Sequence, residues 1–298
     1  MSLTILTPAK INLFFELLGK RSDGYHDVAT LVAPIEFYDA VEVESVPADE
    51  AGSDGVALQC DVSALDGLQP EPMDVPDDCR NLVYKAAKLL RETYRVEQGV
   101  SIKLTKRIPP QSGLGGGSGN AAGTLRACAK VWNLDLSTAE LTALGAKLGS
   151  DVPLFFSDGA TLATGRGEIL DPKPVQKTAP IVIIRPPIGL STPGVYKRCV
   201  VPQNPKSVEE IISAMTASDW ETFNKLIFNR LEFFAAQLTP WVERCRSAIF
   251  QTGAAGGCLC GSGSCYFGIY ETEKAADDAA ESLKAQGWKL AIRTNVLM

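Results

Sequence analysis

Residues 113–122 read Gly-Leu-Gly-Gly-Gly-Ser-Gly-Asn-Ala-Ala, and this stretch indicates the fold more strongly than any other part of the chain. Apolar residues alternate through residues 100–104, which predicts a strand that ends before Pro109-Pro110. Apolar residues recur at helical spacing through residues 125–132. The glycines are therefore predicted to lie at a helix N-terminus, where unpaired backbone N–H groups and the helix dipole attract an anion.

The glycines of this loop also allow a close backbone approach that a Cβ atom would block, so a polyphosphate fits it. The loop is not a Walker A motif, because no Gly-Lys-Ser/Thr ends it. It also departs from G-x-G-x-x-G, because Ser118 and Asn120 stand where the last glycine would fall. A flexible connector is the alternative, but the preceding prolines and the Ala-rich helix that follows favour a phosphate site.

Composition limits the class of protein. A length of 298 residues suits two domains or one large domain, and 45% hydrophobic with 21% charged residues is typical of a globular chain. The net charge of -6 gives a nucleic-acid backbone nothing to bind. Residues 1–8 are too short and too polar for a signal peptide, and no apolar run approaches a bilayer span. We expect a cytoplasmic protein without a nucleic-acid or membrane partner.

The eight cysteines predict reduced thiols rather than a metal site. Cys258, Cys260 and Cys265 form the one cluster, and their spacing lacks the paired C-x-x-C of structural zinc sites. His26 is the single histidine. We therefore assign no metal ligand.

The remaining patterns predict an α+β chain. In residues 9–17 apolar and other residues alternate, which predicts a strand with one buried face and with Lys10 and Asn12 on the same side. Residues 170–179 are the expected domain boundary, and residues 51–76 are an expected exposed excursion. Other predicted elements are a strand at 181–184, helices at 81–94, 138–148, 208–215, 220–229 and 241–250, and a final strand, helix and strand.

Three motifs together resemble those of the GHMP kinases. They are Pro-Ala-Lys-Ile-Asn-Leu at 8–13, the glycine-rich loop after Pro109-Pro110, and Cys-Gly-Ser-Gly-Ser-Cys at 260–265. Arg-Ser-Asp-Gly-Tyr-His at 21–26 and Gly-Ser-Asp-Val-Pro at 149–153 are similar to those of members that act on a cytidyl diphosphate sugar alcohol in the non-mevalonate isoprenoid route. The resemblance covers nearly the whole chain.

The resemblance implies a two-domain α+β GHMP kinase fold. Residues 1–172 would form a ribosomal-protein-like N-terminal domain with the ATP phosphate loop, and residues 173–298 a ferredoxin-like domain completing the substrate site. The implied reaction is ATP-dependent phosphorylation of the 2-hydroxyl of the cytidyl-linked methylerythritol, with Mg²⁺ on the nucleotide phosphates. The implied partner is that small molecule, and we expect a monomer or a weak homodimer.

The resemblance implies that Lys10 and Asp151 are the catalytic pair. Taken alone, Asp151 could be a turn aspartate and Lys10 a surface charge on an edge strand. In the family the matching aspartate is the proposed base for the substrate hydroxyl. A lysine beside it would keep the aspartate ionised and stabilise the charge of the transferring phosphoryl group.

The resemblance also implies the nucleotide site. Asn81 and Lys106 match positions that line the adenine pocket, although a helix N-cap and a surface lysine are equally compatible readings. Ser118 is a candidate hydroxyl neighbour of Mg²⁺. The implied nucleotide-binding residues are Asn81, Lys106, Pro110, Gly113, Leu114, Gly115, Gly116, Gly117, Ser118, Gly119 and Asn120.

For the substrate, the resemblance implies that Tyr25 and Tyr196 stack on cytosine while His26 contacts its hydrogen-bonding edge. Asn12 and Thr192 match positions near the polar groups of the substrate. A lone tyrosine or histidine is more often a structural residue.

The sequence departs from the family's pattern at Gly119, where many relatives have serine, at Arg230, which replaces an acid, and at Val32, which replaces a frequent aromatic residue. Three alternatives stay open. They are a sister kinase for homoserine, mevalonate or a sugar, a catalytically silent ligand sensor, and a nucleic-acid-binding module suggested by fold analogy alone.

Overall fold

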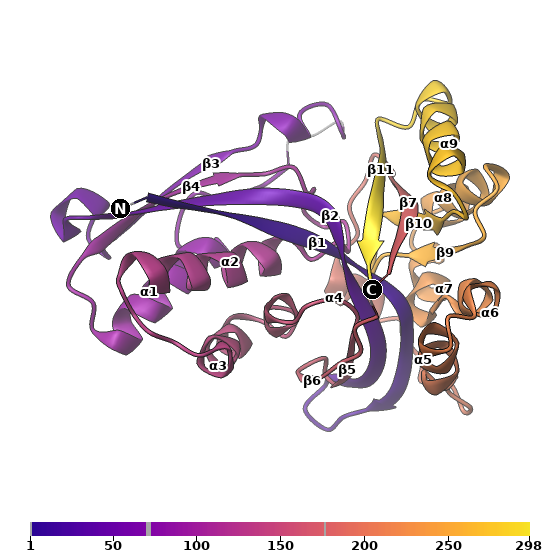
Figure 1. The fold of residues 1–298 in the computed structure, drawn as a ribbon, viewed down its shortest axis with the longest axis horizontal. Helices are drawn as coiled ribbons and strands as arrows, with labels where there is room; N and C mark the ends of the chain where they lie inside the picture. Colours follow the sequence, from indigo (N-terminus) through magenta and orange to yellow (C-terminus); the bar gives the residue numbers. More distant parts are fainter. Residues whose placement is uncertain (1, 70–72, 176) are drawn as a thin grey trace.

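The computed structural model describes residues 2–69, 73–175 and 177–298. It has mixed α and β structure, as the sequence predicts, with the helices and strands in two groups around a continuous sheet (Figure 1). In the first half the strands are β1 (Ser2–Lys20), β2 (His26–Val46), β3 (Val56–Asp61), β4 (Gly99–Thr105), β5 (Thr161–Gly165) and β6 (Ile169–Pro172). The helices there are α1 (Leu82–Tyr94), α2 (Gly116–Val131) and α3 (Thr138–Leu148).

In the second half the strands are β7 (Thr178–Arg185), β8 (Phe228–Asn229), β9 (Gly256–Leu259), β10 (Tyr266–Ile269) and β11 (Leu290–Leu297). Its helices are α4 (Thr192–Tyr196), α5 (Glu209–Thr216), α6 (Trp220–Leu226), α7 (Arg230–Ala236), α8 (Trp241–Gln251) and α9 (Glu273–Ala285). Short 3₁₀ helices cover Ala48–Ala51, Ser63–Leu65 and Pro153–Phe156.

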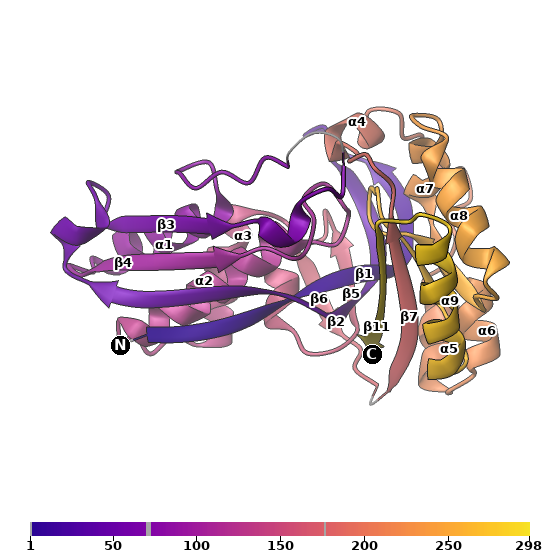
Figure 2. The same cartoon turned by 90° about the horizontal axis from the view of Figure 1, so that it is seen from above.

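The sheet connects the two halves. Its main path runs β3-β4-β2-β11-β7-β10-β9, and β1 pairs antiparallel with β2 along nearly its whole length. The helices α1 and α2 lie against the strands of the first half (Figure 2). In the second half, α7, α8 and α9 share a hydrophobic cluster with one face of β7, β9, β10 and β11, whereas α5 and α6 belong to the cluster that contains Ile11 and Leu13 of β1. This arrangement places the start of α2 near the junction of the two halves.

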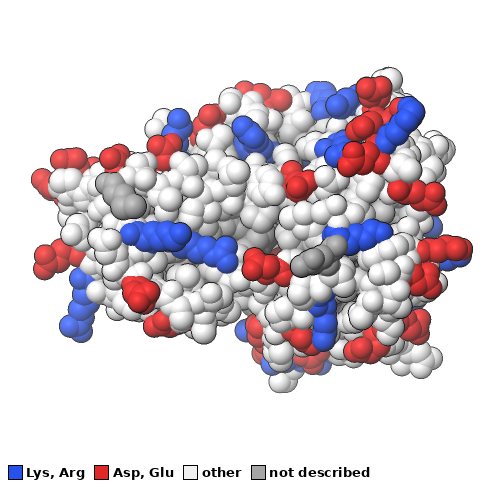
Figure 3. Space-filling view, viewed as in Figure 1, with Lys and Arg blue, Asp and Glu red and all other residues white. Residues whose placement is uncertain are grey.

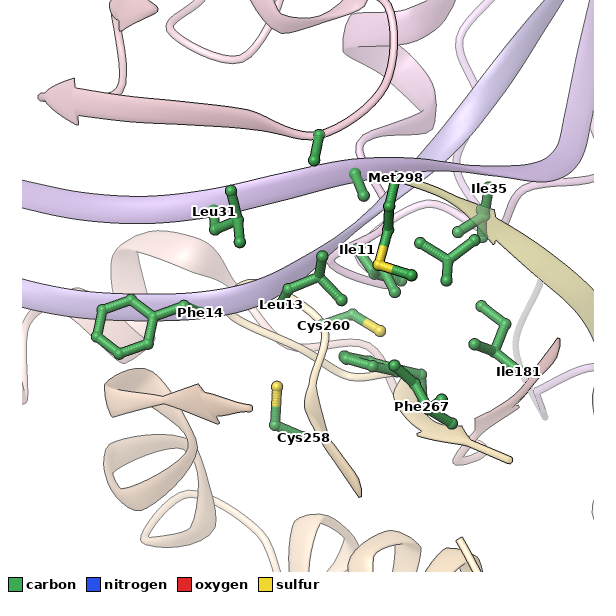
Figure 4. Close-up of a cluster of buried hydrophobic side chains, with 14 of the residues drawn as sticks. Ile11, Leu13, Phe14, Leu31, Ile35, Ile181, Cys258, Cys260, Phe267 and Met298 are labelled. Carbon is green, nitrogen blue, oxygen red and sulfur yellow. The ribbon is translucent and has the colours of Figure 1, made fainter. Parts of the chain in front are cut away.

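A large hydrophobic cluster stabilises this junction (Figure 4). It joins Ile11, Leu13 and Phe14 of β1 with residues of the second half such as Ile181 and Phe267. Burying large apolar side chains contributes about 1.5–3 kcal/mol each, so the two halves are held together by their shared core as well as by the sheet.

Strand β1 is longer and more buried than its sequence pattern predicts. Both faces are buried from Ala9 to Leu17, so the predicted single buried face is wrong and both Phe14 and Glu16 are also buried. The pairing of β1 with β2 shifts register between Asn12 and Phe14, which is the behaviour of a β-bulge and re-aims the side chains on either side. One surface of β1 then faces the large cluster, and the other packs with Phe15 and Leu17 against the helices of the second half.

Most predicted elements are present near their expected bounds, including α1 with Asn81 as its N-cap and α3 at 138–148. The excursion at 51–76 is only partly irregular, because it contains β3, which pairs parallel with β4; residues 70–72 lie outside the described part. The predicted helix at 220–229 ends at Leu226, and β8 and α7 follow it.

Charged side chains of both signs are interspersed over the face seen in Figure 3. In the described part of the chain, no helix has the length and apolar character needed to cross a bilayer. Nor do the described residues bring three or more His, Cys, Asp or Glu side chains together as a metal cluster.

Candidate functional site

The glycine-rich loop directs the N-terminus of α2 toward a cavity that lies between the two halves. Gly115 is the N-cap, with φ of 71°, a conformation that suits glycine, and it gives the helix no side-chain cap. The first N–H groups of α2 therefore stay available to a ligand. We call this cavity, of about 300 Å³, the phosphate cavity; its lining includes Gly113, Gly115, Gly116, Gly117, Ser118, Pro110, Lys10, Asn12, Asp151, Gly261 and Ser262.

The C-terminal glycine-rich motif holds this loop in place. Ser264 N and Cys265 N donate to the carbonyl oxygens of Gln111 and Ser112, at 3.2 and 3.0 Å. A Cβ atom on Gly113 would lie 1.7 Å from the carbonyl oxygen of Cys260. Two motifs that are nearly 150 positions apart thus form one backbone unit, and glycine at 113 is required for their contact.

Lys10 projects from β1 into the phosphate cavity. Its backbone N donates to Leu114 O at 2.9 Å, which ties β1 to the loop. Its Nζ donates to Asn12 Oδ1 at 2.8 Å, and both side chains are almost fully buried. A Cβ atom on Gly261 would lie 3.2 Å from that Nζ, so the amine sits directly under the C-terminal motif.

Asp151 follows α3 and lies on the wall between the phosphate cavity and a second cavity. Within residues 2–69, 73–175 and 177–298, no side chain forms an ion pair with its carboxylate, and Lys10 instead bonds to Asn12. Lys10 and Asp151 therefore share a cavity without the direct contact that a catalytic pair suggests. A substrate hydroxyl placed there would meet an uncommitted carboxylate.

The second cavity, which we call the aromatic cavity, has a volume of about 550 Å³ and is lined by Tyr25, His26 and Tyr196. The His26 and Tyr196 rings lie 5.6 Å apart at an interplanar angle of 43°. Tyr25 is 55% exposed, and the Arg166 guanidinium lies 5.0 Å from its ring centroid. The two cavities share Val28, Asp151, Arg166, Thr192 and Tyr196, so one extended ligand could occupy both.

Two groups of the aromatic cavity have perturbed acid–base properties. Burial, followed by the positive charge of Lys20, lowers the pKa of His26 below its ordinary value. Burial, followed by the negative charge of Asp151, raises the pKa of Tyr196. His26 Nε2 is buried with no hydrogen-bond partner in the described structure. A neutral imidazole with an unpaired nitrogen is suited to contact the polar edge of a ligand.

Thr192 lies at the start of α4, where Ser191 Oγ accepts from Gly194 N at 3.4 Å as an N-cap. The Thr192 hydroxyl is 2.8 Å from Ser262 Oγ. This contact joins α4 to the C-terminal glycine-rich motif, and both residues line the phosphate cavity.

Five predicted nucleotide residues lie outside both cavity linings. Asn81 caps α1 by accepting from Val83 N at 3.0 Å. Leu114 and Gly119 are buried beneath the loop. The Lys106 Nζ donates to Asp39 and, at 2.9 Å, to Asn120 Oδ1.

The structure therefore rules out the alternative that Lys106 is a surface lysine. Its side chain is buried in an ion pair with Asp39, whose carboxylate also accepts from Ile108 N at 2.8 Å. Burial lowers the pKa of Lys106, and Asp39 opposes that shift. The network fixes the end of β4 just before the loop.

Some lining residues could not be predicted from the sequence. Arg166 lines both cavities, and it lies in a Gly-Arg-Gly segment that carries no periodic signal. Thr30 lines the phosphate cavity from β2, where it looks like any other strand threonine. Ser262 is part of the quoted C-terminal motif, but the sequence does not show which of its residues faces the cavity.

Comparisons with known proteins show the family of the chain. The family model of the GHMP kinases N terminal domain matches residues 81–159, and that of the GHMP kinases C terminal matches residues 211–288. A 4-diphosphocytidyl-2-C-methyl-D-erythritol kinase of Geobacillus kaustophilus is 40% identical over 272 residues, covering 91% of this chain and 89% of the relative. The protein of that name from Shouchella clausii is 38% identical over 287 residues, covering 95% and 91%.

Solved structures give the same picture. A crystal structure of 4-(cytidine 5'-diphospho)-2C-methyl-D-erythritol kinase matches with a TM-score of 0.79 and 32% identity, covering 99% of this chain and 100% of that chain. Homoserine kinase from Cytophaga hutchinsonii matches with a TM-score of 0.72 at 17% identity, covering 100% and 94%. At that identity the second likeness shows the fold alone.

Proposed function

We propose, from the premise that this chain belongs to the GHMP kinases and within them to the family of 4-diphosphocytidyl-2-C-methyl-D-erythritol kinases, that its two joined cavities hold ATP and the cytidyl substrate end to end. The chain phosphorylates 4-diphosphocytidyl-2-C-methyl-D-erythritol, as its relatives' names state. The observation that carries the proposal is the position of Asp151 on the wall that the phosphate cavity shares with the aromatic cavity.

The residues that line the phosphate cavity fit a nucleoside triphosphate. The open N-terminus of α2 supplies backbone N–H donors, and the glycines leave room that side chains would fill. Lys10 adds a buried positive charge beside them. In this proposal the residues at 113–118 hold the phosphates, and the buried Lys106 and Asn120 support the start of α2 through their mutual hydrogen bond.

The chemistry asks for alignment and neutralisation of charge. Asp151 accepts the proton of the substrate 2-hydroxyl group while the oxygen of that hydroxyl forms the new bond to the γ-phosphorus of ATP. The bond from the γ-phosphorus to the bridging oxygen breaks, and that oxygen leaves with ADP. Lys10 stabilises the negative charge on the transferring group. Asn12 keeps the Lys10 amine directed at that position through their 2.8 Å hydrogen bond.

Mg²⁺ would supply further neutralisation of the phosphates. Ser118, near the start of α2, lines the cavity and is the residue we propose beside the ion.

The aromatic cavity is proposed to bind cytosine. Tyr196 and Tyr25 provide ring faces, and the unpaired His26 nitrogen faces the hydrogen-bonding edge of the base. Thr192 lies near the sugar-alcohol end, because it also lines the phosphate cavity. We further propose that residues 1–172 form the domain with the phosphate loop and that residues 173–298 complete the substrate site.

The test measures ADP release from purified protein with Mg-ATP and, separately, the cytidyl substrate, methylerythritol phosphate, homoserine and mevalonate. We expect turnover with the cytidyl substrate alone and a loss of about 100-fold or more in kcat for Asp151→Asn. Asp135→Asn, at an exposed position outside both cavities, is the matched control and should retain activity. Turnover of a different alcohol would contradict the proposed substrate, and silence with every acceptor would favour a sensor.

A further inference from the structure

Thr30 lies behind the Lys10 amine and is connected to it by a chain of buried hydrogen bonds. Lys10 Nζ donates to Asn12 Oδ1 at 2.8 Å, and Asn12 Nδ2 donates to Thr30 Oγ1 at 2.9 Å. Thr30 Oγ1 donates to the backbone carbonyl of Phe14 at 2.7 Å. All three side chains are at most 6% exposed, so water cannot readily replace these contacts.

The direction of each bond in this chain follows from the one before. A carbonyl oxygen can only accept a hydrogen bond, so the Thr30 hydroxyl donates its single proton to Phe14 O. The hydroxyl oxygen can then only accept from Asn12. The Asn12 amide must then turn its NH₂ end toward Thr30. Its oxygen is left facing the Lys10 ammonium, which is the one orientation in which the amide attracts that charge.

The β-bulge between Asn12 and Phe14 makes this arrangement possible. It interrupts the regular pairing of β1 with β2 at the place where the Phe14 carbonyl receives a side-chain hydroxyl from β2. Thr30 is therefore connected to a fixed backbone point of the same strand that carries Lys10.

We infer that Thr30 is a positioning residue for phosphoryl transfer, which sets the Asn12 amide orientation and through it the place of the Lys10 amine. This inference rests on the proposed function, since it gives Lys10 a role in transfer. Without the Thr30 hydroxyl, the Asn12 amide loses the contact that distinguishes its two ends. The NH₂ end of the Asn12 amide can then face the Lys10 ammonium. These two donor groups repel each other, and the ammonium moves away from the position at which it stabilises the phosphoryl group.

The test compares Thr30→Val, which has nearly the same shape, with Thr30→Ser, which keeps the hydroxyl. We expect Thr30→Val to lower kcat about tenfold, with KM for ATP changed by less than about threefold, and Thr30→Ser to restore most of kcat. Thr294→Val is the matched control, because Thr294 is buried outside both cavities and its hydroxyl has no partner in the described structure. Equal kcat values for Thr30→Val and the wild type would overturn the inference.

A double-mutant cycle tests whether Thr30 acts through Asn12. In an Asn12→Ala background we expect Thr30→Val to have little further effect on kcat, because the residue that transmits its influence is gone. Effects that multiply independently would show a separate role for Thr30 and contradict the inference.

A measurement without catalysis separates this inference from the proposed function. In ¹H–¹⁵N spectra of the ligand-free protein, the Asn12 side-chain amide should give slowly exchanging signals in the wild type and Thr30→Ser, and lose that protection in Thr30→Val. Protected signals in all three variants would refute the relay even if the wild type is an active kinase. Lost protection in Thr30→Val, with no turnover by the wild type, would instead count against the proposed function.

Discussion

The Arg230 guanidinium donates from Nε and Nη2 to the two carboxylate oxygens of Glu16, at 2.8 and 2.7 Å, although the residues are 214 positions apart. The Glu16 side chain is fully buried and also accepts from Lys206 N at 3.0 Å. Burial would raise the Glu16 pKa, but the Arg230 contact and the backbone hydrogen bonds hold it below its ordinary value. The arginine that departs from the family's acidic pattern is thus the partner of a buried acid in β1.

We expect Arg230→Met to lower the free energy of unfolding by about 3 kcal/mol, because it leaves the Glu16 carboxylate buried without its cation. Urea denaturation at pH 7 measures this. Arg246→Met is the control, since that arginine is 54% exposed and lies 3.9 Å from Glu232, and it should cost less than about 1 kcal/mol. Equal costs for the two variants would contradict a special role for the buried pair.

The Lys106 network leads to a second prediction. Lys106→Met should destabilise the fold by about 3–5 kcal/mol, because Asp39 would stay buried without its partner. If Lys106 does not touch the nucleotide, KM for ATP in the fraction that stays folded should change by less than about threefold. Lys103→Met, at an exposed position three residues earlier on β4, provides the control. A large rise in KM for ATP with unchanged stability would instead indicate that Lys106 contacts the nucleotide.

These two networks show where sequence reasoning stops. Local patterns predicted α1, α3 and the helix behind the loop, because helical periodicity and a capping residue such as Asn81 are local signals. The predicted strand at 9–17 missed the burial of Phe14 and Glu16, because a second buried face comes from helices far along the chain. Pairing of Lys106 with Asp39 depends on strand pairing that no local pattern reveals.

The site follows the same division. The family motifs predicted the lining residues Lys10, Asp151 and Gly113, because each lies within a recognisable stretch. Arg166 was missed because its place depends on how β5 turns back toward the aromatic cavity. The direct contact of Lys10 with Asp151 was expected from shared chemistry, but the nearer acceptor, Asn12 on the same strand, takes the amine.

His26 provides a prediction about pH. As the single histidine of the chain it gives one set of imidazole signals, and its titration midpoint by NMR should lie below 6.5 because burial disfavours the charged ring. The unfolded chain then binds a proton before the folded one as pH falls, so stability should decline below about pH 6.5 by this contribution. His26→Gln should reduce that dependence. A midpoint at or above 6.5 would contradict the prediction.

The last prediction concerns the contact between the two glycine-rich motifs. Gly113→Ala places a Cβ atom 1.7 Å from Cys260 O, so the loop or the C-terminal motif must move by more than a side chain's adjustment. We expect kcat/KM for ATP to fall about 100-fold, because a shift near 1 Å misplaces the phosphates relative to Lys10 and Asp151. Gly67→Ala separates this clash from backbone strain: its φ of 73° is close to the 78° of Gly113, but its Cβ would meet no atom within 4 Å. That control should cost about 1 kcal/mol of stability and leave kcat/KM nearly unchanged. If both variants lose activity equally, the loss is caused by strain in the left-handed backbone and not by the clash with Cys260.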